Sequence, residues 1–115
     1  MGFELDGVPY VALNGGPQFT FDEAVSFEIS CADQTEIDFY WDTLTADGGE
    51  ESQCGWLKDK FGLSWQVVPD VLFEMLMDPD QAKVKQVTKA FLQMQKFDIA
   101  ELKRAFAGEP TTAQE

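Results

Sequence analysis

The sequence of 115 residues suffices for one folded domain and leaves no room for a second full core. Its hydrophobic content of 44% is that of a globular protein, and no apolar run approaches the roughly 20 residues of a membrane-spanning helix. The formal net charge is −13 and residues 1–57 contain no lysine or arginine, which argues against nucleic acid and anionic membranes as partners. No leader peptide precedes the first expected strand, so we expect a cytoplasmic, acidic protein.

The first segment, "FELDGVPYVALNGG" (3–14 and the glycines that follow), predicts a β-hairpin. Its two short apolar runs flank Asp6-Gly7, a dipeptide suited to a type I′ turn. The next segment, "AVSFEISC" (24–31), alternates apolar and polar residues, as a strand with one buried face does. Its apolar face carries Phe27 and Ile29, and its polar face carries Ser26 and Glu28.

An amphipathic helix is expected to follow this strand. Asp33 and Glu36 have the spacing of a capping box, and apolar residues then recur at helical intervals from Ile37 to Leu44. The helix should end at Asp47-Gly48-Gly49.

A second hairpin is expected in "CGWLKDKFGLSWQVVP" (54–69). We predict a strand at 52–57, a turn at 58–62 and a strand at 63–68. Three helices should follow, near 70–76, from Asp78-Pro79, and from Asp98, with residues 110–115 as a disordered tail.

Three stretches carry a resemblance to a known family: "ALNGGPQFTFDEAVSF", "CADQTEIDFYWDTLTADGGEESQCGWLKDKFGLSWQVVP" and "LMDPDQAKVKQVTKAFLQMQKFDIAELKRAF". They resemble the PhnB-like family of the vicinal-oxygen-chelate superfamily, which includes glyoxalases and bleomycin-resistance proteins. The resemblance implies an α+β fold, with a βαβββ module preceded by a β-hairpin and followed by C-terminal helices. It further implies a single domain at 1–109 that lacks most of a first such module.

Members of this family are often labelled 3-demethylubiquinone 3-methyltransferase, and the sequence argues against that activity. An S-adenosylmethionine-dependent enzyme normally has a glycine-rich turn that leads from a strand into a helix. Here the pairs Gly15-Gly16 and Gly48-Gly49 both lie in expected turns that do not connect a strand to a helix.

The resemblance also suggests a ligand site. Superfamily enzymes hold a divalent metal with residues that match, by motif, Ser26 and Gln66 here. Strand alternation independently places Ser64 beside Gln66, and Ser26 beside Glu28, on polar faces. Trp56 could stack on a flat or cationic ligand, and Glu28 could act as a catalytic general base in a lipophilic cleft. The expected ligand-binding residues are therefore Ser26, Glu28, Trp56, Ser64 and Gln66.

We expect neither a bound transition metal nor another cofactor. The chain contains no histidine, and hydroxyl and amide oxygens are weak ligands for such metals. Glu28 and Gln66 could at most hold Mg²⁺ or Mn²⁺ loosely, together with waters. Cys31 and Cys54 are expected to be reduced, buried thiols, and Cys54 has no histidine to make it a nucleophile.

Three functions remain open at this point. The first is a small-molecule-binding protein of the glyoxalase/bleomycin resistance superfamily without transition-metal chemistry. The second is a metal-dependent isomerase, lyase or dioxygenase of the glyoxalase type, and the third is an assembly subunit with a vestigial cleft. For each, we expect a homodimer that completes the fold between subunits, because a lone hairpin and an unpaired sheet edge need a partner. The apolar stripe of Val84, Val87, Phe91 and Met94 could pack across the same interface.

Overall fold

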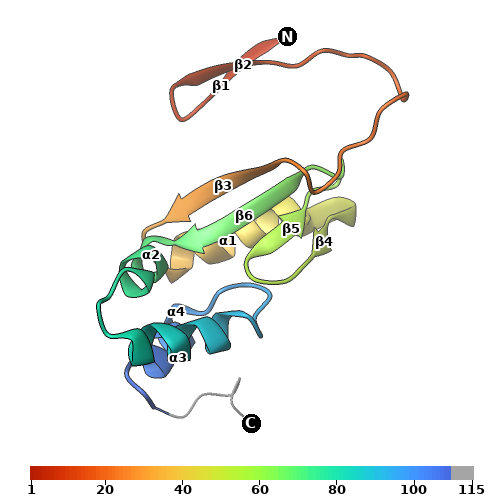
Figure 1. Cartoon of the computed structure of the whole chain (residues 1–115). Coiled ribbons are helices and arrows are strands. Elements are labelled where there is room, and N and C mark those ends of the chain that lie inside the picture. The colour runs from red at the N-terminus through yellow and green to blue at the C-terminus, as the bar shows by residue number, and fades with distance from the viewer. Residues whose placement is uncertain (110–115) are drawn as a thin grey trace.

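The computed structural model describes residues 1–109. These residues have an α+β architecture with four α-helices, one two-stranded antiparallel sheet and one four-stranded mixed sheet (Figure 1). The strands are β1 (Gly2–Leu5), β2 (Val8–Val11), β3 (Ser26–Cys31), β4 (Glu50–Glu51), β5 (Trp56–Lys58) and β6 (Ser64–Pro69). The helices are α1 (Gln34–Thr45), a 3-10 turn (Ala46–Gly48), α2 (Asp70–Leu76), α3 (Gln81–Phe91) and α4 (Ile99–Phe106).

The larger sheet has the strand order β3-β6-β5-β4. The edge strand β3 pairs with β6 in parallel, and the other two pairs are antiparallel. Helix α1 connects β3 to β4 and packs on one face of the sheet, so the chain traces strand, helix, strand, strand, strand (Figure 1). This topology is the βαβββ module that the sequence predicted.

The alternation of β3 explains why α1 covers only one face. Cys31 and its neighbour two residues back, Ile29, contribute to an apolar core with Val67 of β6 and Leu57 of β5. Trp41 of α1 closes this core and is 2% exposed. Burying such side chains contributes roughly 1.5–3 kcal/mol each, so this face fixes the helix on the sheet.

The start of α1 is capped as predicted. Asp33 Oδ1 accepts a hydrogen bond from the backbone N–H of Glu36 at 2.9 Å, and a carboxylate oxygen of Glu36 accepts one from Ala32 N at 3.3 Å. Asp33 satisfies a donor that the first helical turn leaves free, whereas Glu36 binds the residue before the N-cap rather than the N-cap itself. The helix ends at Thr45 and its last turn tightens into the 3-10 segment, in agreement with the expected stop near Asp47.

The predicted strand at 52–57 is wrong in its first part. Residues 52–55 form a turn, and an unpredicted short strand, β4, precedes them. Cys54 (φ 58°) and Gly55 (φ 81°) both have left-handed backbone conformations, which end the extended chain. Their N–H groups donate to Met94 O and Gln95 O, each at 2.8 Å, so the turn is docked on the α3–α4 connection.

A second core lies between β6 and the C-terminal helices. Val68, Leu72 and Met75 pack there with Val87, Phe97 and Leu102, and Phe91 and Met94 pack against the same core. Val87, Phe91 and Met94 of the stripe that we expected at a subunit interface therefore pack within their own chain, and the homodimer itself stays a prediction. Helix α3 contacts α2 and α4 on this side, so Val87 is 0% exposed.

The start of α3 also differs from the prediction. Asp80, not Asp78, is the N-cap residue, because its carboxylate accepts from Ala82 N at 3.0 Å and Lys83 N at 3.5 Å. Asp78 instead accepts from Asp80 N in the preceding turn. By contrast, α4 begins directly after Asp98, as predicted, and that carboxylate accepts from Glu101 N at 3.2 Å.

Gln34, the first residue of α1, joins the two cores. Its amide group donates to Phe97 O at 3.0 Å and accepts from Ile99 N at 2.8 Å. The amide thus satisfies backbone groups at the start of α4, more than sixty residues further along the chain. It ties α4 to the module through polar contacts that the sequence alone did not suggest.

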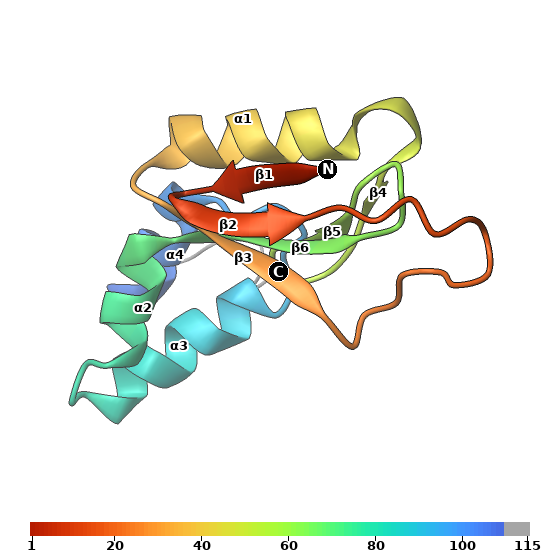
Figure 2. The same cartoon turned by 90° about the horizontal axis from the view of Figure 1, so that it is seen from above.

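The N-terminal hairpin β1–β2 stands apart from the larger sheet (Figures 1 and 2). Asp6 (φ 50°) and Gly7 (φ 79°) form the expected turn with positive φ at both central positions. Residues 12–25 connect the hairpin to β3 without a helix or strand and loop away from the body. In Figure 2 the hairpin lies over β3, which is the edge strand of its sheet.

No helix within residues 1–109 is long and apolar enough to cross a membrane. The disordered tail expected at 110–115 lies outside the described residues. The domain boundary at 109 stays a prediction.

Replacing Gly55 with alanine tests the docked turn. An added Cβ would lie 2.4 Å from Cε2 of the buried Phe97 ring, in a backbone conformation that alanine disfavours. We expect Gly55→Ala to lower the free energy of unfolding by about 2–4 kcal/mol. Urea denaturation measures this loss.

Gly62→Ala is the matched control, because Gly62 also has positive φ (87°) but no atom within 4 Å of an added Cβ. It should cost only about 1 kcal/mol, from backbone strain alone. Equal losses in the two variants would show that the contact with Phe97 is not tight.

Candidate functional site

The polar residues of β3 and β6 meet on the sheet face opposite α1. The parallel register pairs Ser26 with Ser64 and Glu28 with Gln66. The antiparallel register of β5 then places Trp56 beside Gln66. All five residues proposed from the sequence therefore lie on neighbouring positions of one face, and their role in ligand binding stays a prediction.

Gln66 is at the centre of this face, and its side chain is held in place. Its amide Nε2 donates to Ser26 Oγ of the neighbouring strand β3 at 3.0 Å. Both side chains are half-buried, as is Trp56, whereas Glu28 is exposed. A bound molecule could here meet an amide oxygen, a hydroxyl, a carboxylate and an indole face.

Ser64 differs from the expectation that it faces an open cleft. It is 1% exposed, and its hydroxyl has no hydrogen-bond partner among the described residues. It sits between Ser26 and Lys58 in the strand register, so neighbouring side chains cover it. A buried hydroxyl without a partner costs roughly 1–3 kcal/mol.

Lys58 is a residue of this face that the sequence analysis missed. The sequence predicts a turn at this position, but Lys58 is the last residue of β5 and lies on the same face as Trp56. Its ammonium group forms an ion pair with Glu23. The hydrogen bond between the two side chains raises the pKa of Lys58 and lowers the pKa of Glu23. Continuing the alternation of Trp56 by two residues could have identified it.

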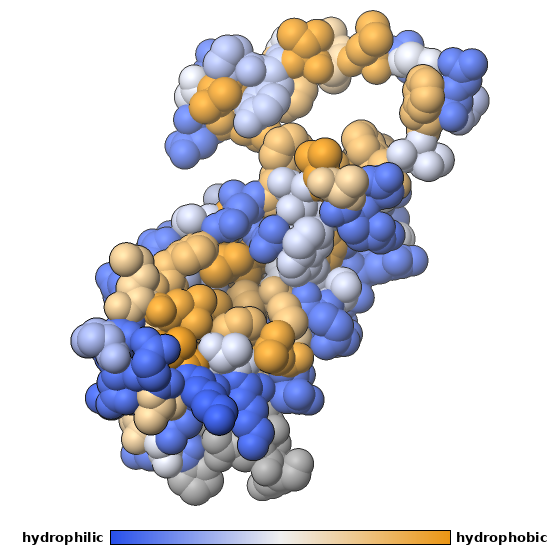
Figure 3. Space-filling model, in the orientation of Figure 1, coloured by the Kyte–Doolittle hydropathy of each residue, from blue (hydrophilic) through white to orange (hydrophobic). Residues whose placement is uncertain are grey.

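A cavity of about 720 Å³ separates the hairpin from the edge of the sheet. Glu28 lines it, and Gln66 does not. Its other walls are mainly apolar or aromatic and come from both sides: Leu5, Val8 and Tyr10 of the hairpin, and Phe27, Ile29, Tyr40, Leu44 and Trp65 of the body. A larger hollow of about 1190 Å³ lies between residues 13–21 and the β5–β6 turn. Figure 3 shows an opening there, between the N-terminal segment and the rest of the molecule.

Trp65 does not belong to the polar face, in agreement with its alternation against Gln66. Its ring lies 5.3 Å from the ring of Phe27, between centroids, and packs against the α1 core. Its indole N–H donates to Asp59 Oδ2 at 2.9 Å, so the polar atom of this side chain is already satisfied. Trp65 is therefore a structural residue.

The described residues contain no group of three or more His, Cys, Asp or Glu side chains arranged to hold a metal ion. Near Gln66, the oxygen atoms that could ligate a metal are those of Glu28, its partner in the strand register, and Ser26, its hydrogen-bond partner. A single carboxylate with neutral oxygens suits a hydrated Mg²⁺ or Mn²⁺ better than a transition metal. The expectation of no bound transition metal stays a prediction.

The two cysteines have different environments. Cys31 is fully buried, and loss of hydration raises the pKa of its thiol to about 11, with a further contribution from the carboxylate of Glu36. Cys54 is half-exposed rather than buried, which corrects the expectation, because its left-handed turn lies at the surface beside Leu92. Both thiols are free.

The βαβββ sheet with one covered and one polar face defines the chain as a glyoxalase-like module. The chain belongs to the family whose model is described as 3-demethylubiquinone-9 3-methyltransferase, which matches residues 1–68. A PhnB protein from Bacillus cereus with the same methyltransferase name is similar in structure, with a TM-score of 0.54 and 29% sequence identity. The match covers 59% of this chain and 61% of the Bacillus cereus protein. No curated protein matches the chain.

The contrast between the cysteines can be tested by alkylation. In the folded protein at pH 8, iodoacetamide should modify Cys54 and leave Cys31 intact, since only about one thiol in a thousand is ionised at that pH when the pKa is about 11. Intact-mass spectrometry should find one added group, and two after unfolding in guanidinium. Modification of Cys31 in the folded protein would contradict its burial.

Proposed function

We propose that this chain is a small-molecule-binding protein that acts without transition-metal chemistry. The observation that carries the proposal is the hydrogen bond of Gln66 to Ser26 beside Glu28, on the sheet face opposite α1. Family membership and the glyoxalase-like fold support it, and the absence of histidine favours binding over metal catalysis. The cytoplasm is the proposed location.

The chemistry of the face suggests the class of ligand. Gln66 offers a donor and an acceptor, Glu28 offers a negative charge, and Trp56 offers an aromatic surface. A net charge of −13 disfavours anionic molecules in general. We therefore propose a small, flat molecule that carries hydrogen-bonding groups and is neutral or cationic.

The composition of the face is costly for a purely structural strand. β-Branched and aromatic residues are favoured in strands, whereas this face places a carboxylate, an amide and two serine hydroxyls side by side. Ser64 adds a buried hydroxyl without a partner among residues 1–109. Proteins tolerate such costs where a residue serves binding or catalysis, which supports a ligand role.

Methyltransferase activity is not part of the proposal, despite the name of the family. The chain passes from β3 to α1 through Ala32 and Asp33, and Asp33 occupies the helix N-cap. The glycine-rich turn that would hold a nucleotide-like cofactor is therefore missing at this strand-to-helix connection. The sheet is also mixed rather than doubly wound and parallel.

A metal-dependent isomerase, lyase or dioxygenase of the glyoxalase type is the second candidate. The observation that favours it is the direct pairing of Glu28 with Gln66, which puts two oxygen ligands on adjacent strands. In that function Glu28 would be the general base or a metal ligand, but not both at once. Any such ion would be Mg²⁺ or Mn²⁺ with several waters.

A thermal-shift screen of neutral and cationic aromatic compounds tests the proposed site. For each compound that stabilises the protein, we expect Gln66→Leu and Glu28→Gln to weaken binding about tenfold or more, the loss of roughly 1.5–3 kcal/mol for a charged hydrogen bond. Gln93→Leu and Glu74→Gln are the matched controls, since both residues are exposed and lie outside the sheet, Gln93 in the turn after α3 and Glu74 on α2. Unchanged binding in the two site variants would contradict the proposal.

Metal analysis separates the two candidate functions. Protein purified without chelator or affinity tag should contain no stoichiometric zinc, nickel or iron. Stabilisation by Mg²⁺ or Mn²⁺ that Glu28→Gln abolishes would favour the enzyme, and a stoichiometric transition metal would overturn the metal-free proposal.

A further inference from the structure

The cavity of about 720 Å³ beside β3 has a lining that the polar sheet face does not explain. Four of its lining residues are aromatic and come from four different elements: Tyr10, Phe27, Tyr40 and Trp65. Its volume lies within the range of roughly 300–1,000 Å³ that small-molecule sites occupy. The cavity is therefore large enough for a ligand of its own.

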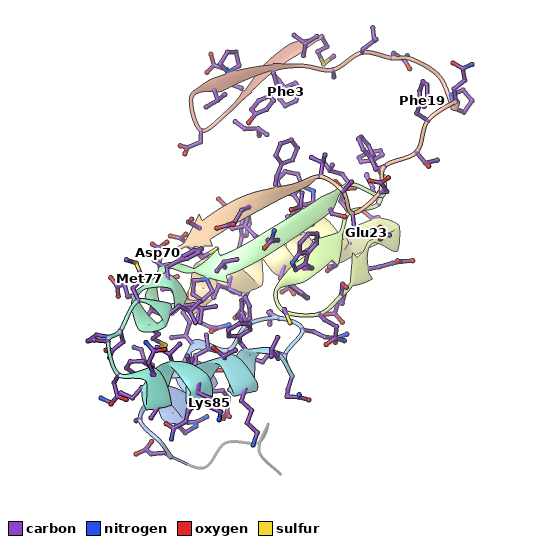
Figure 4. The ribbon with its side chains drawn as sticks, viewed as in Figure 1. Phe3, Phe19, Glu23, Asp70, Met77 and Lys85 are labelled. Atoms are coloured by element: carbon purple, nitrogen blue, oxygen red, sulfur yellow. The ribbon has the colours of Figure 1, made fainter. Side chains whose placement is uncertain are left out.

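The aromatic rings form one connected wall. Tyr10 contacts Phe27 edge-on with ring centroids 5.8 Å apart, and the ring of Phe27 lies 5.3 Å from that of Trp65. The indole N–H of Trp65 donates to Asp59, so only the ring surface of this side chain is left for a ligand. Figure 4 shows hairpin side chains, near the labelled Phe3, on the side that faces β3. Rings of the hairpin and of the sheet thus meet across this gap.

The charges that line the cavity have one sign. Asp6 and Glu28 line it and both are exposed, whereas none of the described residues that line it is a lysine or an arginine. Neither carboxylate forms an ion pair with another of residues 1–109. The formal net charge of −13 adds an attraction for cations at longer range. A carboxylate beside apolar walls attracts a cation more strongly than one in open water does.

An aliphatic wall completes the cavity. Leu5 and Val8 of the hairpin line it and are 39% and 51% exposed, and Leu44 of α1 lines it from the other side. Covering apolar surface of this kind is favourable in proportion to the area removed from water. The cavity therefore offers an apolar surface to one part of a ligand and rings with carboxylates to another.

We infer that this cavity binds a quaternary ammonium compound with an aliphatic body. The electron-rich face of an aromatic ring attracts a cation, and several rings around one cation form the cage that recognises methylated ammonium groups. A quaternary ammonium group has no N–H, so it needs no hydrogen-bond partner inside the cavity. Its charge is balanced by Asp6 and Glu28, and its aliphatic part packs on Leu5 and Val8.

This inference goes beyond the proposed function and does not depend on it. The polar face presents Gln66 and Trp56 opposite α1, whereas the cavity includes Tyr40 and Leu44 of α1 and lies at the edge strand β3. Among the five residues of the polar face, Glu28 alone lines the cavity. The variants that test the cavity therefore leave Glu28 in place.

A titration followed by ¹H–¹⁵N NMR tests the charge of the ligand. The probes are choline and dimethylbutanol, its neutral isostere, in which carbon replaces the nitrogen. We expect choline to bind about tenfold more tightly, because the rings and the carboxylates attract only the cation. Equal affinities, or no amide shifts with choline, would overturn the inference.

Tyr10→Leu tests the aromatic cage. It keeps an apolar side chain and removes one ring face, so choline should bind about threefold or more weakly. Phe3→Leu is the matched control, because Phe3 stacks on Tyr10 in the same hairpin and does not line the cavity. Equal losses in the two variants would show that the hairpin matters and the ring of Tyr10 does not, which contradicts a cage.

Asp6→Asn tests the negative charge. Asparagine adopts the left-handed φ of 50° at this position readily, so the turn is preserved. We expect choline binding to weaken about threefold or more, since a carboxylate close to the cation is lost. Glu4→Gln removes a charge from the same hairpin outside the cavity lining and should have a smaller effect. An equal effect of both substitutions would mean that only the overall charge counts and would contradict the site.

Gln66→Leu separates the cavity from the polar face. It should leave choline binding unchanged, because Gln66 does not line the cavity. In the wild-type complex, nuclear Overhauser effects should connect the N-methyl protons of choline to ring protons of Tyr10 and Phe27. Loss of binding in Gln66→Leu, or contacts with Trp56 in place of those two rings, would assign the cation to the polar face and overturn the inference.

Discussion

The parallel pairing of β3 with β6 is the constraint on which the rest of this structure depends. Its register sets Ile29 against Val67 on the face that α1 covers, and Glu28 against Gln66 on the opposite face. A slip of one residue would turn the apolar set outward and the polar set toward Trp41. The same pairing therefore determines both the hydrophobic core and the candidate ligand face, and neither can change without the other.

The sequence predicted most of this module because its signals are local. The alternation of residues 24–31, the carboxylate caps at Asp33 and Asp98, and the turn at Asp6-Gly7 each act within a few residues of the chain. The turn at 52–55 could not be predicted in the same way. Its left-handed residues are stabilised by carbonyl groups of Met94 and Gln95, roughly forty residues away.

The candidate site was predictable in part for the same reason. Period-two alternation places Ser26 with Glu28 and Ser64 with Gln66, and only the pairing of the strands brings the two sets together. The burial of Ser64 and the ion pair of Lys58 with Glu23 depend on neighbours from other segments, so no pattern within one strand indicated them. The covering of the α3 stripe by α2 and α4 was missed because periodicity identifies an apolar face and not its partner.

The polar residues Ser26, Glu28 and Gln66 lie outside both hydrophobic cores of the chain. For these residues we propose a small molecule as the partner. The most direct measurement of the central claim is a map of ligand-induced amide shifts by ¹H–¹⁵N NMR with a neutral or cationic aromatic fragment. The account predicts that the largest shifts fall on Ser26, Glu28, Trp56 and Gln66. Shifts confined to the C-terminal helices, with β3 and β6 unchanged, would contradict it.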